Sequence, residues 1–142
     1  MTIVVTGATG QLGRLVVESL LRRGASPTDV VATGRDEARL AELATSGVRT
    51  TVTDYADAAS LAAAFQGADR VLLISGSEVG QRLPQHTSVV EAAKAAGVRQ
   101  LLYTSISHAD TAQMALATEH RETERVLRAS GIPFPFLRDS WY

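Results

Sequence analysis

The sequence predicts an α/β protein with one doubly wound parallel sheet, whose six strands follow the order 3-2-1-4-5-6. Strand-like and helix-like segments alternate from end to end, which is typical of βαβ units with right-handed crossovers. The strand-like segments are nearly continuous apolar runs, such as residues 71–74 (VLLI), and parallel strands covered on both faces have this pattern. A chain of 142 residues has the size of one domain, so residues 1–142 are expected to form a single domain.

Each strand is predicted from a short run that is rich in β-branched residues and bounded by turn residues. In chain order these runs are 2–6, 29–33, 48–53, 70–75, 98–105 and 134–137. Helices are predicted between them at 11–23, 37–45, 58–65, 84–96 and about 113–129. The first helix has one apolar stripe with a repeat of about 3.6 residues, formed by Leu12, Leu15, Val16 and Leu20. Glycines that follow four of the helices are expected to form left-handed C-caps: Gly24, Gly47, Gly97 and Gly131.

Composition excludes several classes of function. Lys and Arg number 14 against 15 Asp and Glu, so the net charge of −1 provides no basic field for nucleic acid. The sequence has no cysteine, which excludes disulfides, thiolate catalysis, iron–sulfur clusters and cysteine-bound zinc. The three histidines are scattered without ligand spacing, so no metal site is expected. No apolar run has the length of a membrane span and the N-terminus lacks a leader pattern, so a cytoplasmic protein is expected.

A glycine loop stands between the first predicted strand and the first predicted helix. Gly7, Gly10 and Gly13 have the spacing G-x-x-G-x-x-G. In a dinucleotide site, the first glycine makes the tight turn, the second lets the backbone approach a pyrophosphate, and the third allows close packing of the helix. The helix N-terminus then attracts the anion. We therefore expect this segment to bind a dinucleotide through Gly7, Thr9, Gly10, Gln11, Leu12 and Gly13. The alternative is a glycine turn that serves packing alone.

The end of the second strand decides between NAD and NADP. An NAD site usually has an acidic residue there that accepts a hydrogen bond from the ribose 2′-hydroxyl. This chain has Arg35 instead, whose planar guanidinium suits a 2′-phosphate, while Asp36 fits the N-cap of the next helix. NADP(H) is therefore the predicted cofactor. The alternative for Arg35 is a solvated surface side chain.

Two further predicted strands end in candidate binding residues. Asp54 follows the third strand, where the adenine edge usually lies, and it either accepts from the adenine amino group or caps the next helix. Ser75 and Gly76 follow the fourth strand and are expected beside the central part of the cofactor, where Gly76 permits close approach.

Five segments carry a resemblance to a known family: TGATGQLG (6–13), GR (34–35), ISGSEVGQRLPQH (74–86), YTSISHAD (103–110) and EHRETE (119–124). Together they resemble the NmrA-like branch of the atypical short-chain dehydrogenases, and within it the bacterial type-2 NAD(P)H:quinone oxidoreductases. The resemblance covers the whole chain and implies a Rossmann fold, NADPH binding and hydride transfer to a small quinone-like substrate without flavin. The name-giving members imply an alternative, a redox sensor that binds the dinucleotide without catalysis. Members of this family continue well past the length of this chain.

The resemblance also implies that the Tyr-x-x-x-Lys couple of ordinary short-chain dehydrogenases is not required, and no tyrosine here lies four residues before a lysine. Leu116 and His120 resemble the places of that couple, so His120 is the candidate catalytic residue. It is expected to point toward the nicotinamide, where it either hydrogen-bonds the ribose or protonates a reduced quinone oxygen. The alternative is an exposed histidine on a charged helix. His86 is explained equally well as a surface residue, His108 is expected near the crevice, and Ser105 is expected to line it.

Because the family's substrate-side segments follow the part that this chain resembles, we expect exposed apolar surface and a possible homo-oligomer. The residues expected to be exposed are Phe134, Phe136 and Trp141. A third functional possibility is that the chain acts only as a cofactor-binding fragment.

Overall fold

The computed structural model describes residues 1–140 and contains a six-stranded sheet in the order β3-β2-β1-β4-β5-β6. Each pair of neighbouring strands is parallel. The strands are β1 (Ile3–Val5), β2 (Val30–Gly34), β3 (Arg49–Val52), β4 (Arg70–Leu73), β5 (Gln100–Ile106) and β6 (Phe136–Asp139). The predicted fold class and strand order are both confirmed.

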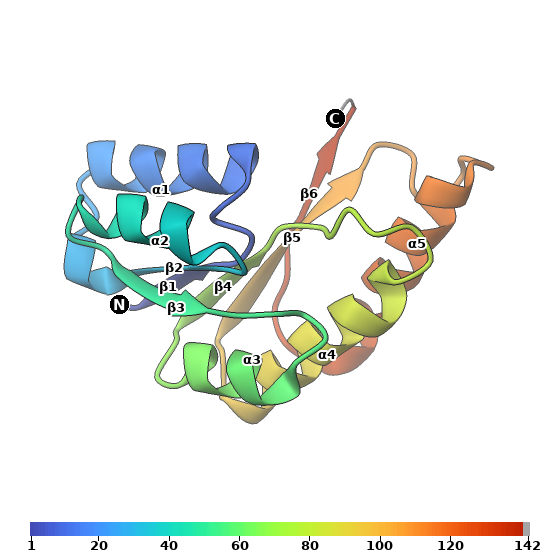
Figure 1. The fold of residues 1–142 in the computed structure, drawn as a ribbon. Helices are drawn as coiled ribbons and strands as arrows, with labels where there is room; N and C mark the ends of the chain where they lie inside the picture. Colours follow the sequence, from blue (N-terminus) through green and yellow to red (C-terminus); the bar gives the residue numbers. More distant parts are fainter. Residues whose placement is uncertain (141–142) are drawn as a thin grey trace.

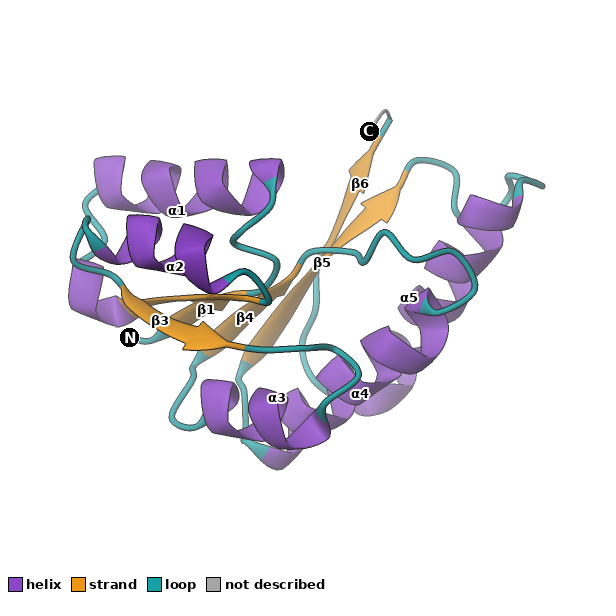
Figure 2. Ribbon diagram, viewed as in Figure 1, coloured by secondary structure: helices purple, strands orange, loops and turns teal. Residues whose placement is uncertain are grey.

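The helices lie on both faces of this sheet (Figure 1). They are α1 (Gln11–Arg22), α2 (Glu37–Ala44), α3 (Ala58–Phe65), α4 (Arg82–Ala95) and α5 (Ala115–Ser130), with a short 3-10 turn at Pro27–Asp29. Helices α1 and α2 cover one face beside β1 to β3, and α3, α4 and α5 cover the other face (Figure 2). The chain therefore changes face after β3, and a crevice is expected at the carboxyl ends of β1 and β4, where the strand order reverses.

Burial explains why the central strands are apolar throughout. Adjacent residues of a strand point to opposite faces. Val4 packs with Leu61 and Phe65 beneath α3, whereas Val5 packs with Val17 of α1, and all five of these apolar side chains are buried. The expected two-sided cover is thus confirmed for the centre of the sheet. The edge strand β3 is partly exposed along its length.

Two boundaries have clear local causes. Helix α4 begins at Arg82, two residues before the predicted start, because Pro84 lies in its first turn, where a backbone N–H has no helical partner. The four glycines that were expected to follow helices all have a positive φ, and Gly131 itself is the left-handed C-cap of α5.

The prediction of exposed aromatic side chains at the C-terminal end is wrong for Phe134 and Phe136. Both are half-buried against the core, and their rings stack with centroids 4.6 Å apart. The Arg128 guanidinium covers Phe136 from 4.9 Å, which removes further ring surface from water. Leu137 is 43% exposed and is the apolar side chain of β6 that faces solvent. Trp141 lies outside the described residues.

Within residues 1–140, none of the helices is long and apolar enough to cross a membrane.

Candidate functional site

A cavity of about 290 Å³ lies at the carboxyl ends of β1, β2 and β4. It brings together seven of the predicted binding residues from four separate segments: Gly7, Thr9, Gly10, Arg35, Asp54, Ser75 and Gly76. Gln11 lines instead an adjoining hollow of about 500 Å³ between α1 and α2. Leu12 is 39% exposed, and Gly13 is buried behind the loop. We refer to the first cavity as the crevice.

The glycine loop is shaped by close approaches of its own backbone. Gly7 has a φ of +62°, and its carbonyl accepts from the N–H of Gly10 at 3.1 Å, which closes a tight turn. A Cβ on Gly13 would lie 2.2 Å from the Gly7 oxygen and 2.5 Å from Cα of Ala8. Gly13 therefore lets α1 pack against the loop. Gly10 has room for a Cβ, whose nearest contact in this structure is the Gly7 oxygen at 3.4 Å, so its hydrogen leaves space on the crevice side.

The N-terminus of α1 has the properties of an anion site. Its N-cap is Gly10, which has no side chain to cap the helix, and the first turn contains no acidic residue. The first N–H groups of a helix lack helical partners and form the positive end of its dipole. An uncapped N-terminus behind a glycine loop is therefore available for a phosphate group.

Gly34 and Arg39 support this loop from β2 and α2, through contacts that no local sequence pattern indicates. A Cβ on Gly34 would lie 2.7 Å from the end of the Thr9 side chain, so any other residue at the end of β2 would require Thr9 to move. Arg39 donates from Nη1 to the Thr9 carbonyl at 3.1 Å. The pair GR at 34–35 gives no local sign of this contact, because the contact depends on how β2 and the glycine loop meet in the fold.

Arg35 extends over the crevice from the end of β2. Its side chain is 65% exposed, and Nη1 forms an ion pair with Oε1 of Glu78 at 2.9 Å, across the crevice in the loop after β4. The other carboxylate oxygen of Glu78 accepts from Nε2 of Gln85 at 3.0 Å. The predicted helix cap at Asp36 is confirmed, because its carboxylate accepts from the N–H of Arg39 at 3.0 Å. Arg35 is therefore the charged group that the end of β2 presents to the crevice.

Asp54 does not cap a helix. Its Oδ1 accepts from the N–H of Ala56 at 2.9 Å, and α3 is capped by Asp57 instead. The capping alternative for Asp54 is therefore wrong, and its carboxylate remains a wall of the crevice. The neighbouring Tyr55 hydroxyl donates to the Ile74 carbonyl at 2.7 Å and lies 2.6 Å from Oγ1 of Thr6. Burial raises the pKa of the Tyr55 phenol, so it stays protonated and ties the ends of β1 and β4 together.

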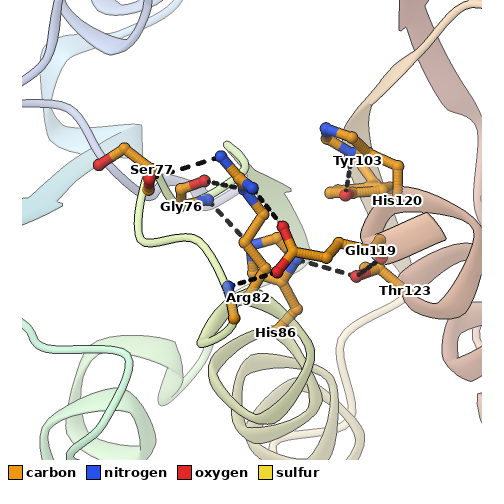
Figure 3. Close-up of polar contacts among 9 residues, drawn as sticks. Gly76, Ser77, Arg82, His86, Tyr103, Glu119, His120 and Thr123 are labelled. Carbon is orange, nitrogen blue, oxygen red and sulfur yellow. Dashed lines mark hydrogen bonds and ion pairs between the residues drawn. The ribbon is translucent and has the colours of Figure 1, made fainter. Parts of the chain in front are cut away.

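His86 is fully buried rather than a surface residue, so the surface interpretation is wrong. Its Nε2 accepts from the N–H of Gly76 at 2.9 Å, and Nδ1 lies 3.0 Å from Oγ1 of Thr123 (Figure 3). Burial, together with the electrostatic effects of His120 and Arg82, lowers the pKa of His86 to about 3, although Glu119 acts in the opposite direction. The ring is therefore neutral at ordinary pH.

Arg82 forms a second buried connection to the same loop. Its Nε donates to the Gly76 carbonyl at 2.6 Å, and Nη1 forms an ion pair with Glu119 of α5. Glu119 also accepts from the N–H of Gly80 at 2.5 Å. Burial alone would raise the pKa of the Glu119 carboxyl, but the hydrogen bonds from Arg82 and Gly80 bring it below its usual value.

His120 is also buried, with 1% of its surface exposed, so the exposed-histidine interpretation is wrong. Its Nδ1 lies 2.5 Å from the hydroxyl of Tyr103, which is itself fully buried. Burial, together with the charge of Arg82, lowers the pKa of His120 to about 4. The ring is neutral at ordinary pH, and its catalytic role stays a prediction.

Ser105 does not line the crevice as expected. It is fully buried, and its hydroxyl donates to Oε1 of Glu124 at 2.6 Å. Glu124 also accepts two hydrogen bonds from Arg138 of β6, at 3.0 and 2.7 Å. A buried carboxylate needs such partners, so Ser105 stabilises the junction of α5 and β6.

His108 is exposed in the loop after β5, with a φ of 58°. Within residues 1–140, no three acidic or histidine side chains are grouped so that they could hold a metal ion.

Comparison with known proteins agrees with this geometry. Residues 7–142 match a family described as NAD(P)H-binding. The chain is 51% identical over 140 residues to quinone oxidoreductase 2 of Escherichia coli, a match that covers 99% of this chain and 49% of that protein. The resemblance noted in the sequence is thereby confirmed.

Solved structures extend the comparison. The E. coli NADPH-dependent quinone oxidoreductase complexed with NADPH superimposes with a TM-score of 0.94 at 50% identity, over 99% of this chain and 50% of that one. The triphenylmethane reductase of Citrobacter sp., complexed with NADP(H), gives a TM-score of 0.95 at 38% identity, over 99% and 50%. This chain thus spans about half the length of the relatives that it matches.

Proposed function

The chain belongs to the NAD(P)H-binding family, and from this premise we propose that it binds NADPH and transfers hydride to a quinone-type acceptor. The observation that carries the proposal is the uncapped N-terminus of α1 behind the glycine loop, with Arg35 at the end of β2 lining the same crevice. The quinone oxidoreductase of E. coli, which matches over 99% of this chain, has been crystallised with NADPH, and this supports the assignment.

The residues of the crevice fit the dinucleotide group by group. The backbone from Gly7 to Gly10 and the α1 N-terminus would hold the pyrophosphate, where added negative charge is favoured. Arg35 would hold the 2′-phosphate, because a dianionic phosphate is a stronger partner for a guanidinium than a single exposed carboxylate. Asp54 is proposed for the adenine amino group. Ser75 and Gly76 would form the wall beside the central part of the cofactor.

The nicotinamide supplies the hydride when NADPH is bound, and the protein supplies binding and orientation. We retain His120 as the proposed catalytic residue. Because its ring is neutral at ordinary pH and its Nδ1 lies 2.5 Å from the Tyr103 hydroxyl, it would pass on to a reduced quinone oxygen a proton that it takes up from solvent during turnover, and would not act as a standing cation. The small-molecule acceptor, a homo-oligomeric state and a cytoplasmic location stay predictions.

Steady-state oxidation of NADPH with 1,4-benzoquinone, followed by NADPH absorbance, tests the proposed reaction. Binding is measured separately by NADPH fluorescence. Turnover that saturates in both NADPH and quinone is expected. Tight binding of NADPH without turnover would favour the redox-sensor alternative, and the absence of binding would overturn the cofactor assignment itself.

A further inference from the structure

We propose that Arg82 and His86 are positioning residues, which hold the loop after β4 in the shape of a crevice wall before a cofactor binds. They do so in a closed ring of hydrogen bonds, here named the clamp, formed by Gly76, Arg82, His86, Glu119 and Thr123. Figure 3 shows the clamp joining three segments: the loop, the first turns of α4 and the first turns of α5. Its effect on cofactor affinity depends on the proposed function, whereas its effect on the loop does not.

In the half of the ring that contains His86, the chemistry of the groups fixes which atoms donate and which accept hydrogen bonds. The N–H of Gly76 can only donate, so Nε2 of His86 must be the unprotonated, accepting nitrogen. A neutral ring then carries its proton on Nδ1, which donates to Oγ1 of Thr123 at 3.0 Å. The Thr123 hydroxyl in turn donates to the Glu119 carbonyl at 3.0 Å. The bond from Gly76 and the donation to Thr123 therefore require the Nδ1–H tautomer of His86, and the Thr123 hydroxyl, whose own proton is used on Glu119, is free to accept it.

Arg82 closes the other half of the ring. Its Nε donates to the carbonyl of Gly76 at 2.6 Å, so both polar groups of this residue are held, the N–H by His86 and the C=O by Arg82. The ion pair between Arg82 and Glu119 connects this half to α5, and Glu119 also accepts from the N–H of Gly80. The clamp thus holds the loop at two positions, four residues apart.

The loop needs such support because residues 74–81 form no helix or strand. Between the two held positions the side chains are exposed, with Val79 at 78%. Gly76 and Glu78 nevertheless form part of the crevice wall. A buried polar group that loses its partner costs about 1–3 kcal/mol, which corresponds to roughly 5- to 150-fold in an equilibrium. Loss of one clamp bond can therefore substantially reduce the fraction of molecules in which residues 74–81 have the conformation that forms the crevice wall.

The test compares two substitutions of His86. His86→Leu removes the acceptor for Gly76, whereas His86→Gln keeps an oxygen acceptor near the place of Nε2. We expect His86→Leu to weaken NADPH about tenfold by fluorescence titration, while His86→Gln stays within about threefold of the parent chain. Without cofactor, His86→Leu should speed hydrogen exchange of the Gly76 amide about tenfold and leave the Val5 and Leu101 amides of the core unchanged.

Thr123→Val keeps the test decisive if His86→Leu does not fold, because it is close to isosteric and Thr123 does not line the crevice. It should weaken NADPH and speed exchange at Gly76 in the same sense, and Thr123→Ser, which keeps the hydroxyl, should restore both. ¹⁵N spectra of the parent chain should show His86 as the Nδ1–H tautomer.

Three results would overturn the clamp. The first is an Nε2–H tautomer of His86 in the parent chain. The second is equal NADPH affinity and equal Gly76 exchange in His86→Leu and His86→Gln. The third is hydrogen exchange in His86→Leu that is faster throughout the core as well as at Gly76. If NADPH binds to no variant and not to the parent chain, the proposed function fails, while the exchange and tautomer measurements still decide the clamp.

Discussion

Two loops border the crevice, and different forces hold them. The glycine loop, from Gly7 to Gly13, is shaped by backbone that packs against backbone, since a single Cβ on Gly13 would overlap the Gly7 carbonyl. The loop after β4 is shaped by side chains of α4 and α5, which form hydrogen bonds with its backbone. The first arrangement depends on the absence of side chains, the second on their presence. The two loops should therefore respond to substitution in opposite ways: adding atoms should damage the first, and removing atoms should damage the second.

The largest effect is expected for Gly13→Ala, because neither Gly7 nor Cα of Ala8 can move away from the new methyl without opening the loop. We expect a loss of about 3 kcal/mol in the free energy of unfolding, at the upper end for overpacked sites, together with loss of NADPH binding. Urea denaturation followed by far-UV circular dichroism measures the first quantity. Gly10→Ala is the matched control and should lose less than about 1 kcal/mol. Equal stability of Gly13→Ala and the parent chain would show that the loop is not held by this contact.

Gly10→Val separates binding from folding within the same loop. Gly10 has a φ of −83°, which any residue can adopt, so the backbone should remain native. The branched side chain would stand where a pyrophosphate must approach, and we expect NADPH to bind at least about a hundredfold more weakly, about 2.7 kcal/mol or more. Fluorescence titration beside a far-UV spectrum checks both statements. Normal NADPH affinity would place the phosphate site elsewhere.

Arg35→Ala tests the part of the crevice wall that comes from the end of β2 and belongs to neither loop. Removing the guanidinium should weaken NADPH by about 1.5–3 kcal/mol, the range for a hydrogen bond to a charged group, and leave NADH nearly unchanged. Titration with each cofactor measures the difference. If both lose affinity equally, Arg35 does not read the 2′-phosphate.

The contrast between the loops also explains what the sequence could predict. The glycine spacing, the following helix and the alternation of segments are local patterns, and they predicted the sheet order and the tight glycine turn before α1. The clamp joins residues that are far apart in the chain: His86 and Thr123 are 37 positions apart. Histidines in polar surroundings of the sequence looked exposed, yet His86 and His120 are buried, because α4 and α5 pack against each other and bury polar as well as apolar side chains. Pairing of this kind has no periodic signature.

Buried neutral histidine makes the clamp sensitive to acid. The pKa of His86 is about 3 in the folded chain and about 6.5 in the unfolded chain, because burial and the charges of His120 and Arg82 oppose its protonation while Glu119 favours it. Below pH 6.5 the unfolded chain therefore gains a proton that the folded chain refuses, and stability falls as the pH falls. At pH 5 this amounts to about 1–2 kcal/mol for His86. Urea denaturation at pH 7.5 and 5.0 should show a smaller decrease for His86→Gln than for the parent chain. An equal decrease in both would mean that His86 takes up a proton while folded.

Glu78→Gln changes an exposed side chain between the two positions that the clamp holds, and should have the smallest effect. Glu78 and Arg35 are 44% and 65% exposed, and an exposed ion pair contributes about 0.2–1 kcal/mol. Glu78 nevertheless occupies the guanidinium that a 2′-phosphate would need, and its charge repels that phosphate. Replacing it by the neutral amide, which can still bond to Gln85, should strengthen NADPH about two- to fivefold and leave NADH unchanged. The gain should disappear in the double variant with Arg35→Ala, because there is then no guanidinium for which Glu78 and the 2′-phosphate could compete. A gain that persists without Arg35 would mean that Glu78 acts through the general field of the crevice, and weaker NADPH binding in Glu78→Gln would mean that the Glu78 carboxylate supports the bound state.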